Sequence, residues 1–108
     1  MATIRTDASL VTLINVFTVR PETQQPLIDI LVEATESVIR HQPGFVSANI
    51  HRSVDGERVT NYAQWRTRAD LEAMMRNPEA RIHMEQAAQL ADGFEPHLYE
   101  VAFTDEAD

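Results

Sequence analysis

Three residues on one short run have the types and spacing to bind a flat aromatic ligand. Residues 58–66 alternate in the pattern of a strand, so Asn61 and Trp65, four residues apart, point to the same face, with small Ala63 between them. An amide can hydrogen-bond a substrate oxygen, and an indole offers a stacking face and one N–H. This spacing predicts a pocket floor. The alternative is that Trp65 fills the core and the backbone satisfies Asn61.

Further candidates lie elsewhere in the chain. Asn15 is a polar residue inside an otherwise apolar run, which indicates either a ligand contact or a bulge or edge position. His83 lies near an apolar helical stripe, where it either reaches a pocket or faces solvent. Met74, Met75 and Met84 are typical of a core, although soft unbranched side chains also suit an adaptable pocket.

Strands and helices must bring these residues together. Runs of β-branched and aromatic residues predict strands, and an Asp-Gly turn joins two of them as a hairpin. Thr, Asn, Pro and Gly at the ends of periodic apolar stripes predict helices. The predicted strands span residues 10–20, 45–53, 58–66 and 94–104, and the predicted helices follow Thr23, Thr67 and Asn77-Pro78. This order predicts the split βαβ arrangement of an α+β, ferredoxin-like fold.

Helices in this arrangement cover only one face of the sheet. The other face carries Tyr62, Gln64 and their neighbours, with no helix in the chain to cover them. Because an exposed sheet face with apolar content usually marks an interface, we expect a homodimer that packs sheet against sheet. The domain is expected over residues 10–103, after a flexible segment 1–9 and before an acidic tail 104–108.

Composition excludes several classes of function. With 108 residues the chain forms one domain, and with no cysteine it has neither disulfides nor thiolate metal sites. All nine basic residues are Arg, so lysine chemistry is impossible, and the net charge of -8 argues against nucleic-acid binding. The four His have no metal-ligand spacing, and we expect no metal. No signal or membrane-spanning segment is apparent, so a cytoplasmic protein is expected.

The run Asn61-Tyr62-Ala63-Gln64-Trp65 resembles the antibiotic biosynthesis monooxygenase domain family. Supporting matches are Pro21-Glu22, the run from Pro43 to Ala48, Asp55-Gly56 and Asn77-Pro78-Glu79, so that the likeness covers about residues 10–103. The run around Asn61 is most similar to the small, actinorhodin-type, quinone-forming monooxygenases of aromatic polyketide pathways.

The resemblance implies a dimeric α+β barrel that oxidises a phenolic or anthrone-type ring to a quinone with O₂, without metal, flavin or haem. Asn61 and Trp65 match residues of the family's site. Leu71 replaces a tyrosine of that site, and Met84 stands near the position of an arginine. His83 is therefore expected to handle the proton, since its charge changes near neutral pH. The expected substrate-binding residues are Asn15, Ala63, Leu71, Met74 and Met84.

Two alternatives remain open. The related haem-degrading monooxygenases keep an Asn and a haem-ligating His at about the positions of Asn15 and His83, although Met74 replaces a Trp of that branch. A non-catalytic dimeric barrel that binds a small molecule is the second alternative.

Overall fold

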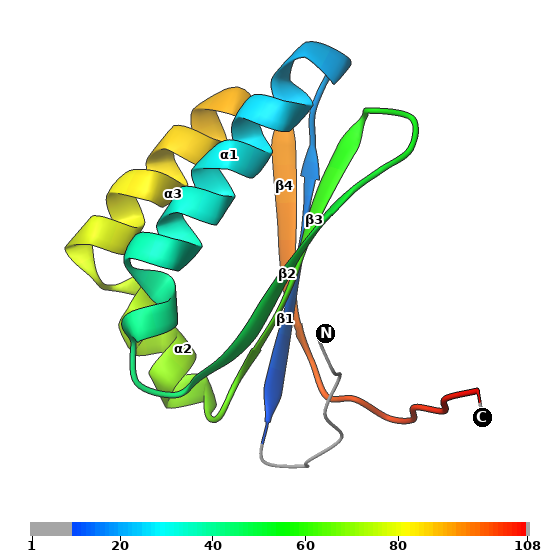
Figure 1. The fold of residues 1–108 in the computed structure, drawn as a ribbon. Coiled ribbons are helices and arrows are strands. Elements are labelled where there is room, and N and C mark those ends of the chain that lie inside the picture. Colours follow the sequence, from blue (N-terminus) through cyan, green and yellow to red (C-terminus); the bar gives the residue numbers. More distant parts are fainter. Residues whose placement is uncertain (1–9, 108) are drawn as a thin grey trace.

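The computed structural model of the protein describes residues 10–107, in which helices cover one face of a four-stranded sheet (Figure 1). The strands are β1 (Val11–Thr18), β2 (Phe45–Arg52), β3 (Arg58–Trp65) and β4 (Gly93–Tyr99). The helices are α1 (Pro21–Ser37), the short 3₁₀ helix η1 (Ile39–His41), α2 (Arg68–Met75) and α3 (Pro78–Leu90). The strand order β2-β3-β1-β4, antiparallel throughout, confirms the α+β, ferredoxin-like prediction.

Helix α1 begins earlier than the sequence predicted. Its first residue is Pro21, whose fixed φ and missing N–H suit the first helical position. The prediction that Thr23 is the cap was wrong: Thr23 lies inside the first turn, and its hydroxyl accepts a hydrogen bond from the Arg20 N–H at 3.0 Å. The helix continues through Pro26 and ends at Ser37, before η1.

The β2–β3 hairpin forms as predicted. Gly56 in its turn has φ +80°, a conformation that favours glycine. The Ser53 hydroxyl donates to the Asp55 carboxylate at 2.6 Å, and the Glu57 N–H donates to the same oxygen at 2.9 Å. These hydrogen bonds, the one from Ser53 above all, lower the pKa of the Asp55 carboxyl.

Side-chain caps start the other two helices. Thr67 Oγ1 accepts a hydrogen bond from the Asp70 N–H at 3.1 Å and starts α2, as the sequence predicted. Asn77 Oδ1 accepts from the N–H groups of Glu79 and Ala80 and starts α3. None of the helices between residues 10 and 107 is long and apolar enough to cross a membrane.

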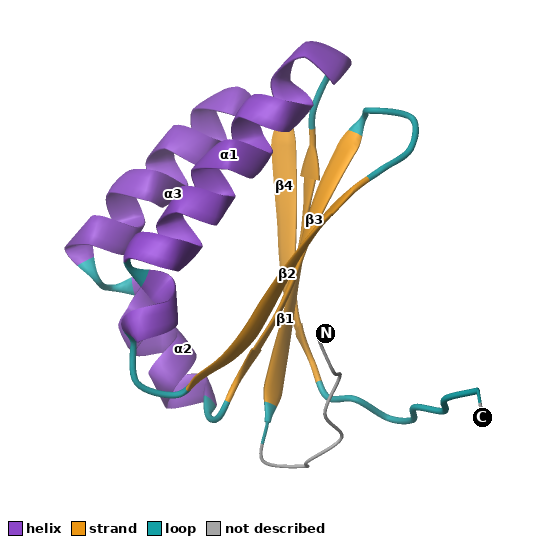
Figure 2. Ribbon diagram, in the orientation of Figure 1, coloured by secondary structure: helices purple, strands orange, loops and turns teal. Residues whose placement is uncertain are grey.

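Strand β4 is shorter than predicted and lies at an edge of the sheet. It ends at Tyr99, and the chain beyond it leaves the sheet as a loop (Figure 2). Pro96 lies within β4, and the edge position that a missing N–H favours is confirmed. The expected N-terminal segment 1–9 lies outside the described residues.

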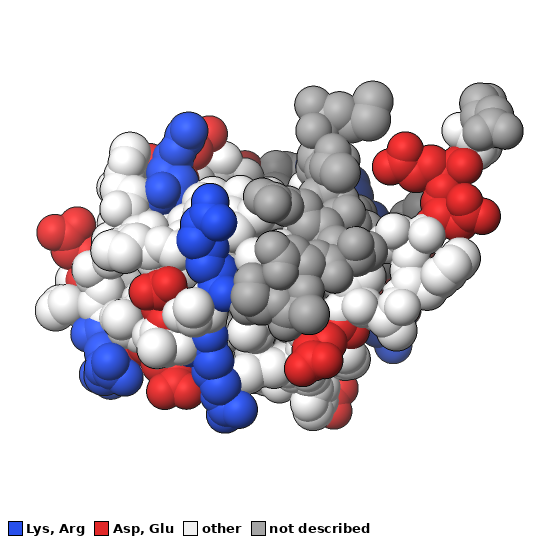
Figure 3. Space-filling view, turned by 90° about the horizontal axis from the view of Figure 1, so that it is seen from below, with Lys and Arg blue, Asp and Glu red and all other residues white. Residues whose placement is uncertain are grey.

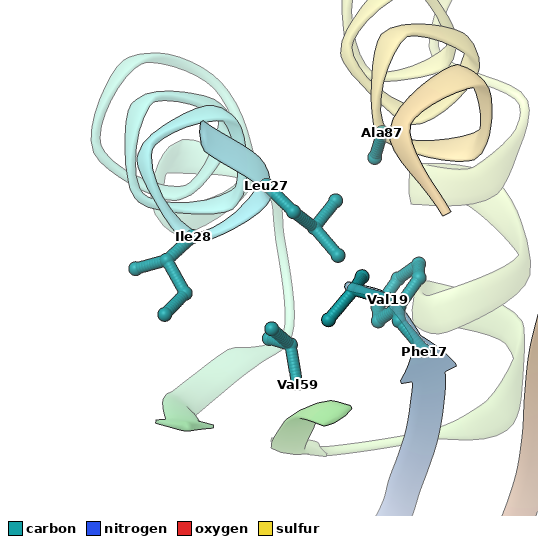
Figure 4. Packing of buried hydrophobic residues seen from close by; sticks show 6 residues of the cluster. All are labelled: Phe17, Val19, Leu27, Ile28, Val59 and Ala87. Carbon is teal, nitrogen blue, oxygen red and sulfur yellow. The ribbon is translucent and has the colours of Figure 1, made fainter. Parts of the chain in front are cut away.

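The core lies between the sheet and the helix pair α1 and α3. Leu27 of α1 points toward Val19 and Phe17, while Ala87 approaches from α3 and Val59 from the sheet (Figure 4). Leu27 and Val59 are fully buried. A second buried cluster around Trp65 joins α2 to the lower part of the sheet, so that all three α-helices are fixed on one face.

No helix within residues 10–107 covers the opposite face of the sheet (Figure 1). Within this single chain the sheet is open, with β2 and β4 at its edges, and is not closed into a barrel. Seen from below, basic side chains follow one another in a column across the face, with acidic side chains beside them (Figure 3).

Candidate functional site

An apolar cavity of about 200 Å³ lies between the helix-facing side of the sheet and the helices. Most of its wall is aliphatic or aromatic. Its polar side chains include Asn15 on β1, Asn61 on β3, Thr35 on α1 and His83 on α3. An apolar cavity with a few convergent polar groups is typical of a small-molecule site.

The register of the sheet places the two asparagines side by side. Asn15 of β1 is the direct antiparallel partner of Asn61 of β3, and Pro96 of β4 lies on the other side of Asn15. The pairing at Asn15 is regular, so it does not lie at a bulge, and its strand is inside the sheet. The structure therefore brings together two amides that are 46 residues apart in the chain.

Neither amide oxygen is used by the fold. The Oδ1 atoms of Asn15 and Asn61 are buried, and neither has a hydrogen-bond partner among the described residues. A buried acceptor without a partner costs about 1–3 kcal/mol, so such groups are rare in folded proteins. A half-turn about χ2 exchanges the amide oxygen and nitrogen, so each side chain can meet either a donor or an acceptor on a ligand.

Small side chains next to the amides make room for a ligand. Ala63 follows Asn61 on the same face of β3, and Ala48 of β2 is its partner. A one-residue bulge between Phe45 and Ser47 sets this register, because without it Ser47 would lie opposite Ala63. The bulge therefore keeps this part of the cavity floor small and apolar.

Trp65 forms part of the cavity wall. Its side chain is only 1% exposed, and its ring meets that of Phe45 edge to face, with the centroids 5.6 Å apart and the planes at 87°. Leu71 and Met74 pack in the same cluster. The indole is thus both part of the core and part of the cavity wall, so the two interpretations of Trp65 are compatible.

His83 reaches the cavity from α3 and is half-buried. Its Nδ1 lies 3.0 Å from the carbonyl oxygen of Glu79, one turn earlier. Since a carbonyl oxygen only accepts, Nδ1 carries the hydrogen in this bond. In the neutral ring Nε2 then has the free lone pair, which is the form required of a general base.

The remaining predicted residues divide between two places. Ala63, Met74 and Met84 line the cavity. Leu71 does not line the cavity. It is on the buried side of α2 and faces a neighbouring trough between α2 and β4. Within residues 10–107, no three His, Cys, Asp or Glu side chains are grouped closely enough to hold a metal ion.

Sequence reasoning missed the contribution of β4. Phe94 and Pro96 bring this strand to the cavity. Phe94 also contacts buried Phe17, with the ring centroids 6.1 Å apart. Only the β1–β4 register could have identified these residues, because nothing local in the sequence connects Pro96 with Asn15.

The chain resembles known proteins over most of its length. A family model described as antibiotic biosynthesis monooxygenase matches residues 10–86. The tetracenomycin-F1 monooxygenase of Streptomyces glaucescens is 55% identical over 85 residues, which cover 79% of this chain and 76% of that protein.

Solved structures share the fold. A monooxygenase from the gene ActVA-Orf6 of Streptomyces coelicolor, in complex with nanaomycin D, is 25% identical, with a TM-score of 0.80 over 94% of each chain. SnoaB, a cofactor-independent oxygenase from Streptomyces nogalater, is 24% identical, with a TM-score of 0.77 over 90% of this chain and 97% of SnoaB. The second likeness concerns the fold alone.

Proposed function

Because the chain belongs to the antibiotic biosynthesis monooxygenase family, we propose that it oxidises a flat phenolic, anthrone-type polyketide to a quinone with O₂. The relative from Streptomyces glaucescens is named for tetracenomycin F1, which makes that compound the first substrate to test. The reaction needs no added cofactor, because the substrate itself supplies the electrons.

The observation that carries the proposal is the unpartnered amide pair beside a tryptophan. Asn15 and Asn61 lie next to each other in an apolar cavity, and Trp65 offers a flat wall beside them. An aromatic ring fits against the indole while its oxygen substituents hydrogen-bond the amides. In this role the amides find the partners that the fold does not provide.

The chemistry balances without an external reductant. A base removes a proton from the ring CH₂ group, and the resulting enolate transfers an electron to O₂. The two radicals combine to form a C–O bond, and the hydroperoxide loses water to give the new carbonyl group. One CH₂ group and one O₂ thus give one C=O and one H₂O.

The amides and the apolar wall both favour the enolate. Amide N–H groups of Asn15 and Asn61 can stabilise the charge that develops on the substrate oxygen, and this interaction is stronger where water is excluded. His83 is proposed to remove the proton through Nε2, since its Nδ1 is engaged with the Glu79 carbonyl. Ala63, Met74 and Met84 are proposed to contact the rings.

A homodimer is part of the proposal. The sheet face opposite the helices includes half-buried Ile14, Val16 and Tyr62, which a second copy packed sheet against sheet would cover. The proposal also includes the cytoplasmic location expected from the sequence. Sedimentation of the purified protein tests the dimer, and a monomer at micromolar concentration would contradict it.

Oxygen uptake in metal-free buffer tests the activity. We expect tetracenomycin F1 or a related anthrone to consume one O₂ per molecule and to gain one atom of ¹⁸O from labelled O₂. Trp65→Phe should slow turnover by about tenfold, because the smaller ring no longer fixes the substrate orientation. Unchanged turnover in this variant would remove Trp65 from the site.

Variants of His83 distinguish the proposed function from the haem-binding alternative. As the base it takes the proton of the substrate, so His83→Gln should slow oxygen uptake. The haem alternative instead predicts a Soret band upon haem titration that is lost in His83→Ala. Glu79 is not altered in either variant, so the start of α3 is unchanged.

A further inference from the structure

A second hollow adjoins the cavity. This trough has a volume of about 550 Å³ and lies between α2 and β4. Three residues line both hollows: Leu13 on β1, Met75 on α2 and Pro96 on β4. The trough and the cavity are therefore neighbours that meet at these side chains.

The trough has an apolar floor and a polar rim. The floor includes Leu98 of β4, its direct strand partner Leu13, and Leu71 on the buried side of α2. At the rim, Arg68 and Glu72 form an ion pair on the exposed side of α2, with Nε and Oε1 3.0 Å apart. A flat ring with a polar end would match both surfaces, with the ring on the apolar floor and the polar end at the rim.

The cavity alone is too small for an extended substrate. Its volume of about 200 Å³ is below the roughly 300–1,000 Å³ of pockets that enclose most of a drug-sized ligand. A molecule of several fused rings that places its reacting ring beside Asn61 and Trp65 must therefore extend past the cavity. The trough shares three lining residues with the cavity and has leucines in its wall, so it is the nearest hollow that can take the rest of the molecule.

We propose that the trough between α2 and β4 is an outer subsite that holds the non-reacting end of a polycyclic aromatic substrate. This inference rests on the proposed function, since it concerns the same substrate. The reacting ring lies in the cavity, and the far rings lie over Leu98 with their polar substituents toward Arg68 and Glu72.

Met75 stands where the two compartments meet. Its side chain is half exposed and lines both hollows. An unbranched thioether can move aside at little cost, so it allows a flat molecule to bridge the compartments. The outer subsite then fixes how deeply the substrate enters, and thus which ring meets the amides.

Binding of a long and a short ligand to trough variants tests the outer subsite. Leu98→Trp fills the trough without touching the cavity, and Ile82→Trp is the matched control, because Ile82 is an exposed apolar residue that lines neither hollow. Calorimetric titration under argon, with a four-ring naphthacenone and with three-ring anthrone, measures affinity without turnover.

We expect Leu98→Trp to weaken binding of the four-ring ligand by about tenfold or more while anthrone binds within about twofold of the wild type. Ile82→Trp should change neither affinity. If Leu98→Trp does not fold, the smaller Leu98→Phe fills part of the trough and should discriminate between the ligands in the same direction.

Unchanged binding of the four-ring ligand, or equal weakening of both ligands, would overturn the outer subsite. A wild type that binds both ligands and, once air is admitted, oxidises neither would contradict the proposed function and leave the subsite standing if the length discrimination is observed. A wild type that binds neither ligand overturns both.

Discussion

Two polar pairs bridge β1 and β3 on opposite faces of the sheet, and the fold satisfies only one of them. On the face without helices, Gln64 Nε2 donates to Thr12 Oγ1 at 3.0 Å, and both side chains are almost completely buried. On the helix-facing side, Asn15 and Asn61 are also direct neighbours, yet neither amide oxygen has a partner within residues 10–107.

The difference in hydrogen bonding between the two pairs indicates which pair stabilises the fold and which one is available to a ligand. Buried polar groups that hydrogen-bond each other contribute modestly to stability and specify the register of the strands. Buried acceptors without partners destabilise the fold, and they are retained where a ligand uses them. The same two strands thus carry a structural pair on one face and a proposed ligand-binding pair on the other.

The largest expected effect is on catalysis. Asn61→Ala should lower kcat/KM for the anthrone substrate by about 10²-fold, because a hydrogen bond to the developing enolate is lost. The free energy of unfolding should not fall, because the variant removes an orphaned buried oxygen. Oxygen uptake and urea unfolding measure the two quantities.

Asn49→Ala is the control for that variant. Asn49 is a half-buried asparagine of β2 that donates to the Tyr62 carbonyl at 3.2 Å and does not line the cavity. It should retain activity within about twofold, as expected of a residue outside the site. If Asn49→Ala and Asn61→Ala lose activity equally, the comparison between the two faces fails.

The next effect is on stability. Gln64→Leu should lower the free energy of unfolding by about 1–3 kcal/mol, because it leaves the Thr12 hydroxyl buried without this donor. Adding Thr12→Val should recover part of that loss, since both polar groups are then replaced. Urea unfolding of both single variants and the double variant gives the coupling energy, which would be zero if the pair did not interact.

The smallest expected effect is the difference in unfolding free energy between two variants of β1. Thr12→Val should lower the free energy of unfolding by about 1 kcal/mol, whereas Asn15→Val should leave it unchanged or raise it by a similar amount. Thermal unfolding followed by circular dichroism measures both. A lower stability in Asn15→Val than in Thr12→Val would mean that the Asn15 amide serves the fold.

Local patterns predicted most of the fold. The Asp-Gly turn, the Thr67 cap and the alternation in β3 act between neighbouring residues, so their structures follow from the sequence alone. The predicted start of α1 was wrong because a threonine can hydrogen-bond the backbone either as a cap or from within the first turn. The helix begins at Pro21, which suits the first helical position. Thr23 therefore lies inside the first turn, where its hydroxyl accepts from the Arg20 N–H.

The candidate site was predicted only in part. Asn61, Ala63 and Trp65 share one strand, so their common face followed from a period of two. Leu71 is on the expected helix but faces the trough, while Phe94 and Pro96 line the cavity without a local signal. Which residues line a cavity depends on the packing of separate elements, and that packing is absent from a local pattern.

The sequence by itself determined the order of the elements, the exclusion of thiolate and lysine chemistry, and the shared face of Asn61 and Trp65, because each follows from composition or from short-range periodicity. Only the tertiary structure decided that Asn15 lies beside Asn61, that a bulge places Ala48 opposite Ala63, and that both amide oxygens lack partners. Strand register and hydrogen-bond satisfaction are long-range properties, so they arise only when distant segments pair.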